Sequence, residues 1–116
     1  MPARKAQPLH PLEHHPSFRA VIAAALPLAE LATRLADQEI VGALVIASSD
    51  LADGFAAPPD SPRRLEAHTR AWVCIRDIDR AVAAARHGRR APSELLRRAQ
   101  RAVDRADVLV GALLPN

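Results

Sequence analysis

The chain has 116 residues, of which 49% are hydrophobic and 25% charged, as expected for one soluble domain with a buried core. No uncharged apolar run approaches the about 20 residues that span a bilayer, and the N-terminus has no signal-peptide pattern, so we expect a cytoplasmic protein that does not enter membranes. The single cysteine, Cys74, excludes an internal disulfide and a multi-cysteine metal site.

The net charge of +3 conceals an asymmetry along the chain. Residues 63–105 contain twelve arginines against five acidic residues, and the rest of the chain is net acidic. Alanine is abundant, and Phe18, Phe55 and Trp72 are the only aromatic residues. This composition favours helices over strands.

Residues 1–16 hold four prolines and three histidines, which predicts a flexible arm preceding the folded domain. His10 and His14, with Glu13 between them, would share one face of a helix and could then bind a metal ion. Prolines on both sides make that helix unfavourable. We therefore expect no metal site.

The first helix is predicted over about residues 17–36. Its apolar stripe has alternating steps of four and three, namely Phe18, Ile22, Ala25, Ala29, Ala32 and Ala36. Asp37 is a suitable N-cap for a second helix, with Glu39 in its first turn. Pro27 leaves two alternatives, because it either kinks the first helix or begins a longer second helix that runs to about Gly54.

The remaining helices have clearer signals. The second carries the stripe Ile40, Leu44, Ala47, Leu51 and Phe55. The third is predicted to start with Ser61 as N-cap and Pro62 as first residue, to carry Ala71, Ile75, Ile78, Val82 and Ala85, and to end at Gly88 in a left-handed conformation. The fourth is predicted to be capped by Ser93, to end before Pro115, and to carry Leu95, Ala99, Ala102, Ala106, Leu109 and Leu113.

These elements predict an all-α fold, an antiparallel up-down-up-down four-helix bundle over residues 17–116. The alternative is that the short apolar runs 39–47 and 108–114 are buried strands. Both runs extend into their neighbours with helical spacing, and no hairpin or βαβ spacing is present, so helices are favoured.

Two segments, residues 40–47 and 71–75, are apolar around the whole helix. A helix that is apolar on all sides is normally buried on all sides, which a single bundle cannot achieve. We therefore expect a homo-oligomer whose subunit interface includes Ile40, Val41, Val45, Trp72 and Val73.

The stretch "IASSDLADGF" places Ser48, Ser49, Asp50 and Asp53 in an apolar setting, which raises the question of a catalytic site. No histidine in the same helix is placed to act as a base. Carboxylates near a helix C-terminus need cationic partners. We therefore expect no catalytic residues but an ion-pair clasp between the second and third helices, formed by Asp50, Asp53, Arg63, Arg64 and Arg70.

The arginines of the second half are the main signal for a binding function. A basic helix face and the preceding linker could contact phosphates, with the candidate residues Arg86, Arg89, Arg90, Arg97, Arg98, Arg101 and Arg105. The alternative is a solvated surface with local pairs such as Glu94–Arg98. No aromatic residues alternate with these arginines, so base stacking is not indicated.

The order "SSDLADGF", a Pro/Ser-containing loop and "AWVCIRDI" resembles the four-helix-bundle family of 23S rRNA intervening-sequence proteins, which includes accessory proteins of diversity-generating retroelements. Residues 51–55 match the family's I-A-E-G-F, with Asp53 in place of Glu. Ala71, Cys74 and Asp77 stand at A-x-x-S-x-x-E. Leu26-Pro27 lies near the family's F-P at the start of helix 2, which favours the second alternative for Pro27.

This resemblance implies a four-helix bundle that assembles into a ring-shaped homopentamer, without catalytic activity. For the retroelement branch it also implies binding to nucleic acid and a reverse transcriptase. We therefore expect a non-enzymatic scaffold or accessory protein without a cofactor. The alternative function is an accessory protein that binds RNA or DNA through its arginines.

Overall fold

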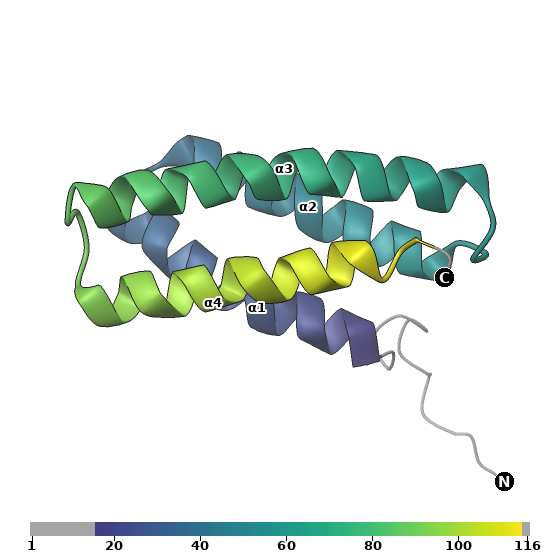
Figure 1. The fold of residues 1–116 in the computed structure, drawn as a ribbon, viewed down its shortest axis with the longest axis horizontal. Coiled ribbons are helices and arrows are strands. Elements are labelled where there is room, and N and C mark those ends of the chain that lie inside the picture. The colour runs from purple at the N-terminus through teal and green to yellow at the C-terminus, as the bar shows by residue number, and fades with distance from the viewer. Residues whose placement is uncertain (1–15, 115–116) are drawn as a thin grey trace, which may run out of the picture.

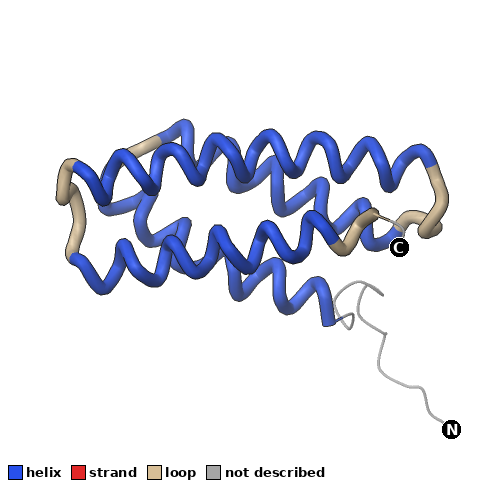
Figure 2. The backbone as a smooth tube through the Cα atoms, in the orientation of Figure 1, coloured by secondary structure: helices blue, strands red, loops and turns tan. Residues whose placement is uncertain are grey.

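The computed structural model describes residues 16–114, with side chains from Arg19 onward. This part of the chain forms four helices and no strands: α1 (Pro16–Leu35), α2 (Gln38–Ala56), α3 (Pro62–His87) and α4 (Ser93–Gly111) (Figures 1 and 2). The predicted all-helical class is therefore confirmed, and the strand alternative is wrong. The arm predicted over residues 1–16 lies outside the described residues except for Pro16.

The four helices surround one core. Each helix packs against the next in sequence, and α1 also packs against α4. Figure 1 shows α3 and α4 in front, with α1 and α2 behind them. The linker between α3 and α4 and the loop between α2 and α3 lie at opposite ends of the molecule (Figure 2). None of the described helices is long and apolar enough to cross a membrane.

The N-caps of α2 and α3 are those expected. One carboxylate oxygen of Asp37 accepts hydrogen bonds from the backbone N–H groups of Glu39 at 3.0 Å and Ile40 at 3.1 Å. Ser61 Oγ accepts one from Arg64 N–H at 3.3 Å. Pro27 consequently lies inside α1, where it lacks the N–H for one intrahelical hydrogen bond, and it does not begin the second helix.

Two predicted helix ends differ from the structure. Gly88 ends α3 in a right-handed conformation, and Arg89 takes the left-handed one with φ 51°. The N–H of Arg90 then donates to the carbonyl of Ala85 at 3.0 Å, so the left-handed residue is needed one position after the cap. Ser93 does not cap α4 but is its first residue. Pro92 occupies the cap position, without a side-chain hydrogen bond.

The core confirms the predicted stripes of α2, α3 and α4 but only part of the stripe predicted for α1. Of its members, Ala32 is buried and Ala25 half-buried, whereas Ile22, Ala29 and Ala36 are exposed, and the Phe18 side chain lies outside the described ones. The other buried residues of α1 are Val21, Ala24, Leu28 and Leu31. Residues 20–29 are apolar on every side, so two faces compete for the core. The face with the leucines buries more apolar area, which is the larger stabilisation.

Gly54 allows α2, α3 and the end of α4 to meet closely. A Cβ at Gly54 would lie 2.8 Å from Leu113 Cδ2 and 3.0 Å from Ala67 Cβ, closer than carbon atoms normally approach. Gly42 lies in the same helix, and a Cβ there would have nothing within 4 Å. The two glycines therefore differ in what a methyl group would meet.

We expect Gly54→Ala to lower the free energy of unfolding by about 1–3 kcal/mol, since the added methyl overpacks the contact with Leu113. Gly42→Ala is the matched control and should raise it by about 0.5–1 kcal/mol, because alanine is the better residue inside a helix. Urea denaturation of both variants measures the difference. A stabilising effect of Gly54→Ala would contradict the close packing.

Candidate functional site

Asp50 and Arg70, two members of the predicted clasp, meet in the structure. Asp50 is 4% exposed, and its Oδ1 accepts a hydrogen bond from Arg70 Nη2 at 2.9 Å. The Arg70 side chain is 58% exposed and also donates to Glu66 Oε1 at 3.2 Å. The other carboxylate oxygen of Asp50 is buried without a partner among the described residues. Arg70 is thus the group that compensates the buried charge.

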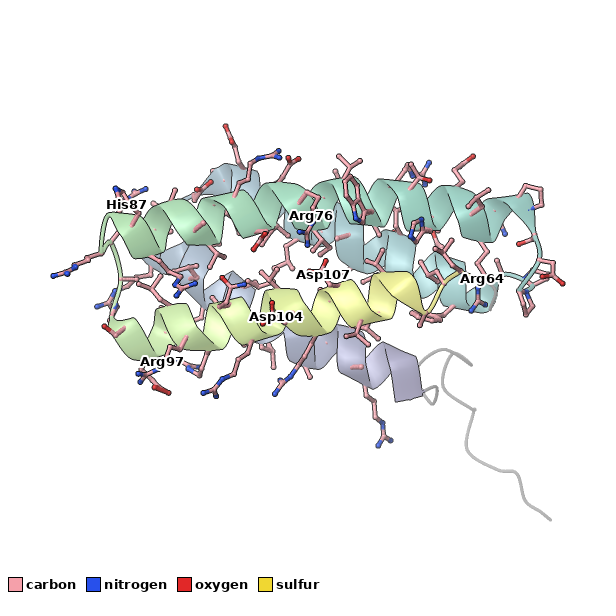
Figure 3. All side chains as sticks on the ribbon, viewed as in Figure 1. Arg64, Arg76, His87, Arg97, Asp104 and Asp107 are labelled. Carbon is pink, nitrogen blue, oxygen red and sulfur yellow. The ribbon has the colours of Figure 1, made fainter. Side chains whose placement is uncertain are left out.

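Arg64 does not form an ion pair with Asp53, so this part of the predicted clasp is wrong. Its guanidinium donates to backbone carbonyls, from Nε to Leu113 at 2.9 Å and from the two terminal nitrogens to Ala57 and Ala112 at 3.3 Å. It also lies 5.5 Å from the centre of the Phe55 ring. Figure 3 shows Arg64 at the end of the molecule where α4 ends. Helix C-termini collect partial negative charge, which explains this choice of partner.

Asp53 and Arg63 are exposed, and within residues 19–114 neither side chain has an ion-pair partner. The clasp across α2 and α3 therefore consists of the Asp50–Arg70 pair.

The described residues offer little for catalysis at this position. Burial and the neighbouring carboxylates of Asp50 and Asp77 raise the pKa of the Cys74 thiol, which disfavours the reactive thiolate. Cys74 lines a groove between α2 and α3, whose lining combines apolar residues such as Ala43 and Ile46 with the charged residues Asp37, Glu39, Asp77 and Arg80. No group of three or more potential metal-ligating side chains occurs within the described part of the chain, and His10 and His14 lie outside it.

Asp50 is buried and Arg70 is exposed, so substitutions of the two residues should differ in their effect on stability. We expect Arg70→Met to lower the urea midpoint more than Asp50→Asn does, because it leaves a buried charge uncompensated, whereas the exposed Arg70 can be solvated after loss of Asp50. Arg80→Met is the control, since Arg80 pairs with Asp77 on the surface and should have almost no effect. An equal effect of Arg70→Met and Arg80→Met would contradict this role of Arg70.

An exposed apolar surface covers the outer side of α1 and α2, and we call its residues Ile22, Leu26, Val41 and Val45 the α1–α2 face. Their side chains are 45%, 66%, 39% and 63% exposed, respectively. Ala25 of α1 and Ser48 of α2 line one small cavity that also reaches Ile75 and Ala106 of the core, so these two residues mark the adjoining sides of α1 and α2. Ile22 lies three positions from Ala25 and four from Leu26, and Val45 lies three positions from Ser48 and four from Val41, so the four exposed residues continue these adjoining sides outward. Residues 20–29 and 40–49 carry no charge.

Ile40 does not belong to this surface. It was predicted at the subunit interface but is 2% exposed, because it packs into the core beside the N-cap of α2. Ile22 and Leu26 were not predicted on this surface, because the stripe predicted for α1 placed Ile22 in the core. The signal that could have revealed them is the run of ten uncharged residues at 20–29.

A second exposed apolar surface lies on α3, and we call its residues Leu65, His68 and Trp72 the Trp72 ledge. Trp72 is 50% and Leu65 58% exposed. His68 and Trp72 line a notch with Gly111 of α4, and the three ledge residues follow helical spacing. Val73, also predicted at the interface, is 48% exposed next to the ledge. The predicted interface residues therefore do not form one surface.

Charged groups beside the ledge neutralise one another. Arg76 forms ion pairs with Asp107 of α4 and, at 3.4 Å, with Asp79. Figure 3 shows Arg76 and Asp107 between α3 and α4. The Arg76 guanidinium also lies 5.9 Å from the centre of the Trp72 ring, a cation–π contact.

The seven candidate arginines divide into partnered and unpartnered groups. Arg97 pairs with Glu94 at 2.6 Å and lowers the pKa of that carboxyl by its hydrogen bond, Arg98 reaches Glu30 of α1 at 3.2 Å, and Arg86 donates to the Gln100 amide oxygen at 3.2 Å. The Glu94–Arg98 pair given as an example under the alternative of a solvated surface is not formed, because Arg98 pairs with Glu30 of α1 and Glu94 with Arg97. No described carboxylate lies within ion-pair distance of the remaining four, namely Arg89, Arg90, Arg101 and Arg105.

Comparison with known proteins gives no match to any family model, curated protein or solved structure. The resemblance to the intervening-sequence proteins thus rests on the sequence motifs alone, and its implications stay predictions.

Proposed function

We propose that this protein is a non-enzymatic scaffold or accessory factor whose copies self-associate through the α1–α2 face. The observation that carries the proposal is this face itself, in which Leu26 and Val45 are about two-thirds exposed and no charge occurs in residues 20–29 and 40–49. Soluble monomers seldom expose a continuous apolar surface of this kind, and such surfaces typically mark contacts with other proteins.

The proposed architecture is an up-down-up-down four-helix bundle. Contacts between residues near opposite helix ends support it. Arg64 in the first turn of α3 reaches the end of α4, and Arg98 in the first half of α4 reaches Glu30 in the second half of α1. The resemblance to the intervening-sequence proteins supports a ring of five copies, in which the α1–α2 face of each copy contacts a different surface of the next.

Val45→Glu should dissociate the assembly into single chains, because it places a charge in the middle of an uncharged contact. Val108→Glu is the matched control. Val108 is the more exposed of the two valines at 73%, and it lies on α4, so its variant should keep the wild-type size. Sedimentation velocity at micromolar concentration distinguishes the two. The proposal fails if the wild type is monomeric or if both variants behave alike.

Nucleic-acid binding is a second candidate function, favoured by Arg89, Arg90, Arg101 and Arg105. These side chains are exposed and unneutralised by any described carboxylate. Residues 86–105 carry seven arginines against Glu94 and Asp104. Arginines of this kind contact phosphates and bind with little sequence preference and strong salt dependence.

Arg101→Gln with Arg105→Gln should weaken binding to single-stranded RNA and reduce the slope of log affinity against log salt by about 1 for each lost phosphate contact. Arg63→Gln is the control, since Arg63 is exposed in the first turn of α3, at the end away from the linker that contains Arg89 and Arg90. Fluorescence anisotropy at several salt concentrations measures both quantities. RNA binding that is insensitive to salt, or equally reduced by the control, would reject this candidate.

A further inference from the structure

The Trp72 ledge borders two hollows on the surface formed by α3 and α4. One is the notch that His68 and Trp72 form with Gly111, and we call it the Trp72 recess. The other is lined by Leu65, Leu113 and the α2–α3 loop, and we call it the Leu65 recess. Leu65 and Trp72 are seven residues apart in α3, so they share one side of the helix about 10 Å apart. The ledge thus offers two recesses in line.

The start of α1 lies one helix away from this surface. Residues 108–111 form one turn of α4. The first two line a hollow with Ala20 and Ala23 of α1, whereas the last two line the Trp72 recess. Figure 1 shows the start of α1 beside the second half of α4. The width of α4, about 10 Å, therefore separates the two, and the fifteen residues before Pro16 would span about 45 Å as a polyproline II helix.

The chain before α1 contains a proline pattern that suits these recesses. Lys5, Pro8 and Pro11 stand at K-x-x-P-x-x-P in the stretch "KAQPLHP". A polyproline II helix has three residues per turn and rises about 3.1 Å per residue, so the two prolines would lie on one side about 9 Å apart. This spacing matches the about 10 Å between the two recesses along α3. Proline-rich segments of this kind bind aromatic-lined grooves, because their conformation is largely set before binding.

We propose that residues 5–12 bind the Trp72 ledge of their own chain, with Pro8 and Pro11 in the two recesses. This inference goes beyond the proposed self-association and does not depend on it, because the ledge and the α1–α2 face are different surfaces. A tethered segment needs little affinity. At an effective concentration of about 1 mM, a dissociation constant of about 0.1 mM keeps about nine-tenths of the chains in the bound state.

Polar groups on the ledge complement the segment. No described residue accepts a hydrogen bond from the Trp72 indole N–H, and the carbonyls of a polyproline II segment have no partner within it. Asp60 lines the Leu65 recess, is exposed, and forms no ion pair with a described residue. The carboxylate of Asp60 is therefore available to the ammonium of Lys5.

The direction of the segment follows from this charge pair. With Lys5 beside Asp60, the first proline of the motif reaches the Leu65 recess and the second reaches the Trp72 recess. The stretch from Pro11 to Pro16 then reaches about 17 Å when extended, which exceeds the width of α4. The chain is thus long enough to pass α4 and join α1.

The test uses the full chain with Pro8→Ala and Pro11→Ala combined. The sequence has one tryptophan and no tyrosine, so the emission reports on Trp72. The double variant should shift this emission to longer wavelength and raise the acrylamide quenching constant, because release of the segment exposes the indole to water. Pro2→Ala is the matched control. Its proline precedes the motif, so both quantities should keep their wild-type values.

A synthetic peptide of residues 5–12 gives a second measurement. At millimolar concentration it should return the emission of the double variant to the wild-type wavelength, and the same peptide with both prolines replaced by alanine should not. Lys5→Glu should also release the segment. Asp60→Lys in the same chain should restore binding, because the two charges are then exchanged.

The outcomes separate this inference from the proposed function. It is overturned if the double variant keeps the wild-type emission, or if Pro2→Ala shifts the emission equally. It is also overturned if the difference between wild type and double variant disappears on dilution, because the ledge then binds another chain. A monomeric wild type rejects self-association alone. If circular dichroism shows that the double variant has lost helix, the peptide is added to the Lys5→Glu chain instead, with the same expected result.

Discussion

The guanidinium of Arg64 joins three helices at one end of the molecule. The last carbonyls of an α-helix have no partner within the helix and must find donors elsewhere. From the first turn of α3, Arg64 supplies donors to Ala57 after α2 and to Ala112 and Leu113 after α4. Gly54 complements this bond, since its missing side chain leaves room for Leu113. The positions of α2, α3 and α4 therefore depend on one cation and one glycine.

Helix α1 is held differently, which explains its unusual surface. Its polar link to α4 is the exposed Glu30–Arg98 pair, a type of contact that contributes less than about 1 kcal/mol. Its attachment must come mainly from burial of Val21, Leu28 and Leu31. The opposite side of α1 is equally apolar at Ile22 and Leu26, although the core does not need it there. An apolar outer side has a physical purpose if another chain covers it.

The buried sides of α2, α3 and α4 were predicted well from the sequence, and that of α1 was predicted poorly. In α3 and α4, charged residues mark the outer side, and Asp37 and Ser61 mark the starts of α2 and α3. In α1, residues 20–29 contain nothing polar, so periodicity could not distinguish the buried side from the exposed one.

The partners of the arginines were predictable only in part. Asp50–Arg70 follows from hairpin geometry and charge, and the structure contains this pair. Arg64 binds backbone carbonyls, which every residue possesses and which therefore leave no pattern in the sequence. Arg98 had two carboxylates within reach, and only the packing of α1 against α4 decides for Glu30 over Glu94.

The Asp50–Arg70 pair is better understood as a register device than as a source of stability. Removing a carboxylate from water is costly, and one buried oxygen of Asp50 lacks a partner, so an apolar residue would serve stability equally well. A shift of α2 along α3 by one turn, however, would separate Asp50 from Arg70 and leave the buried carboxylate without a cation. The pair thus penalises other alignments. Since this alignment determines where Val41 and Val45 emerge from α2, it also preserves the α1–α2 face through which self-association is proposed.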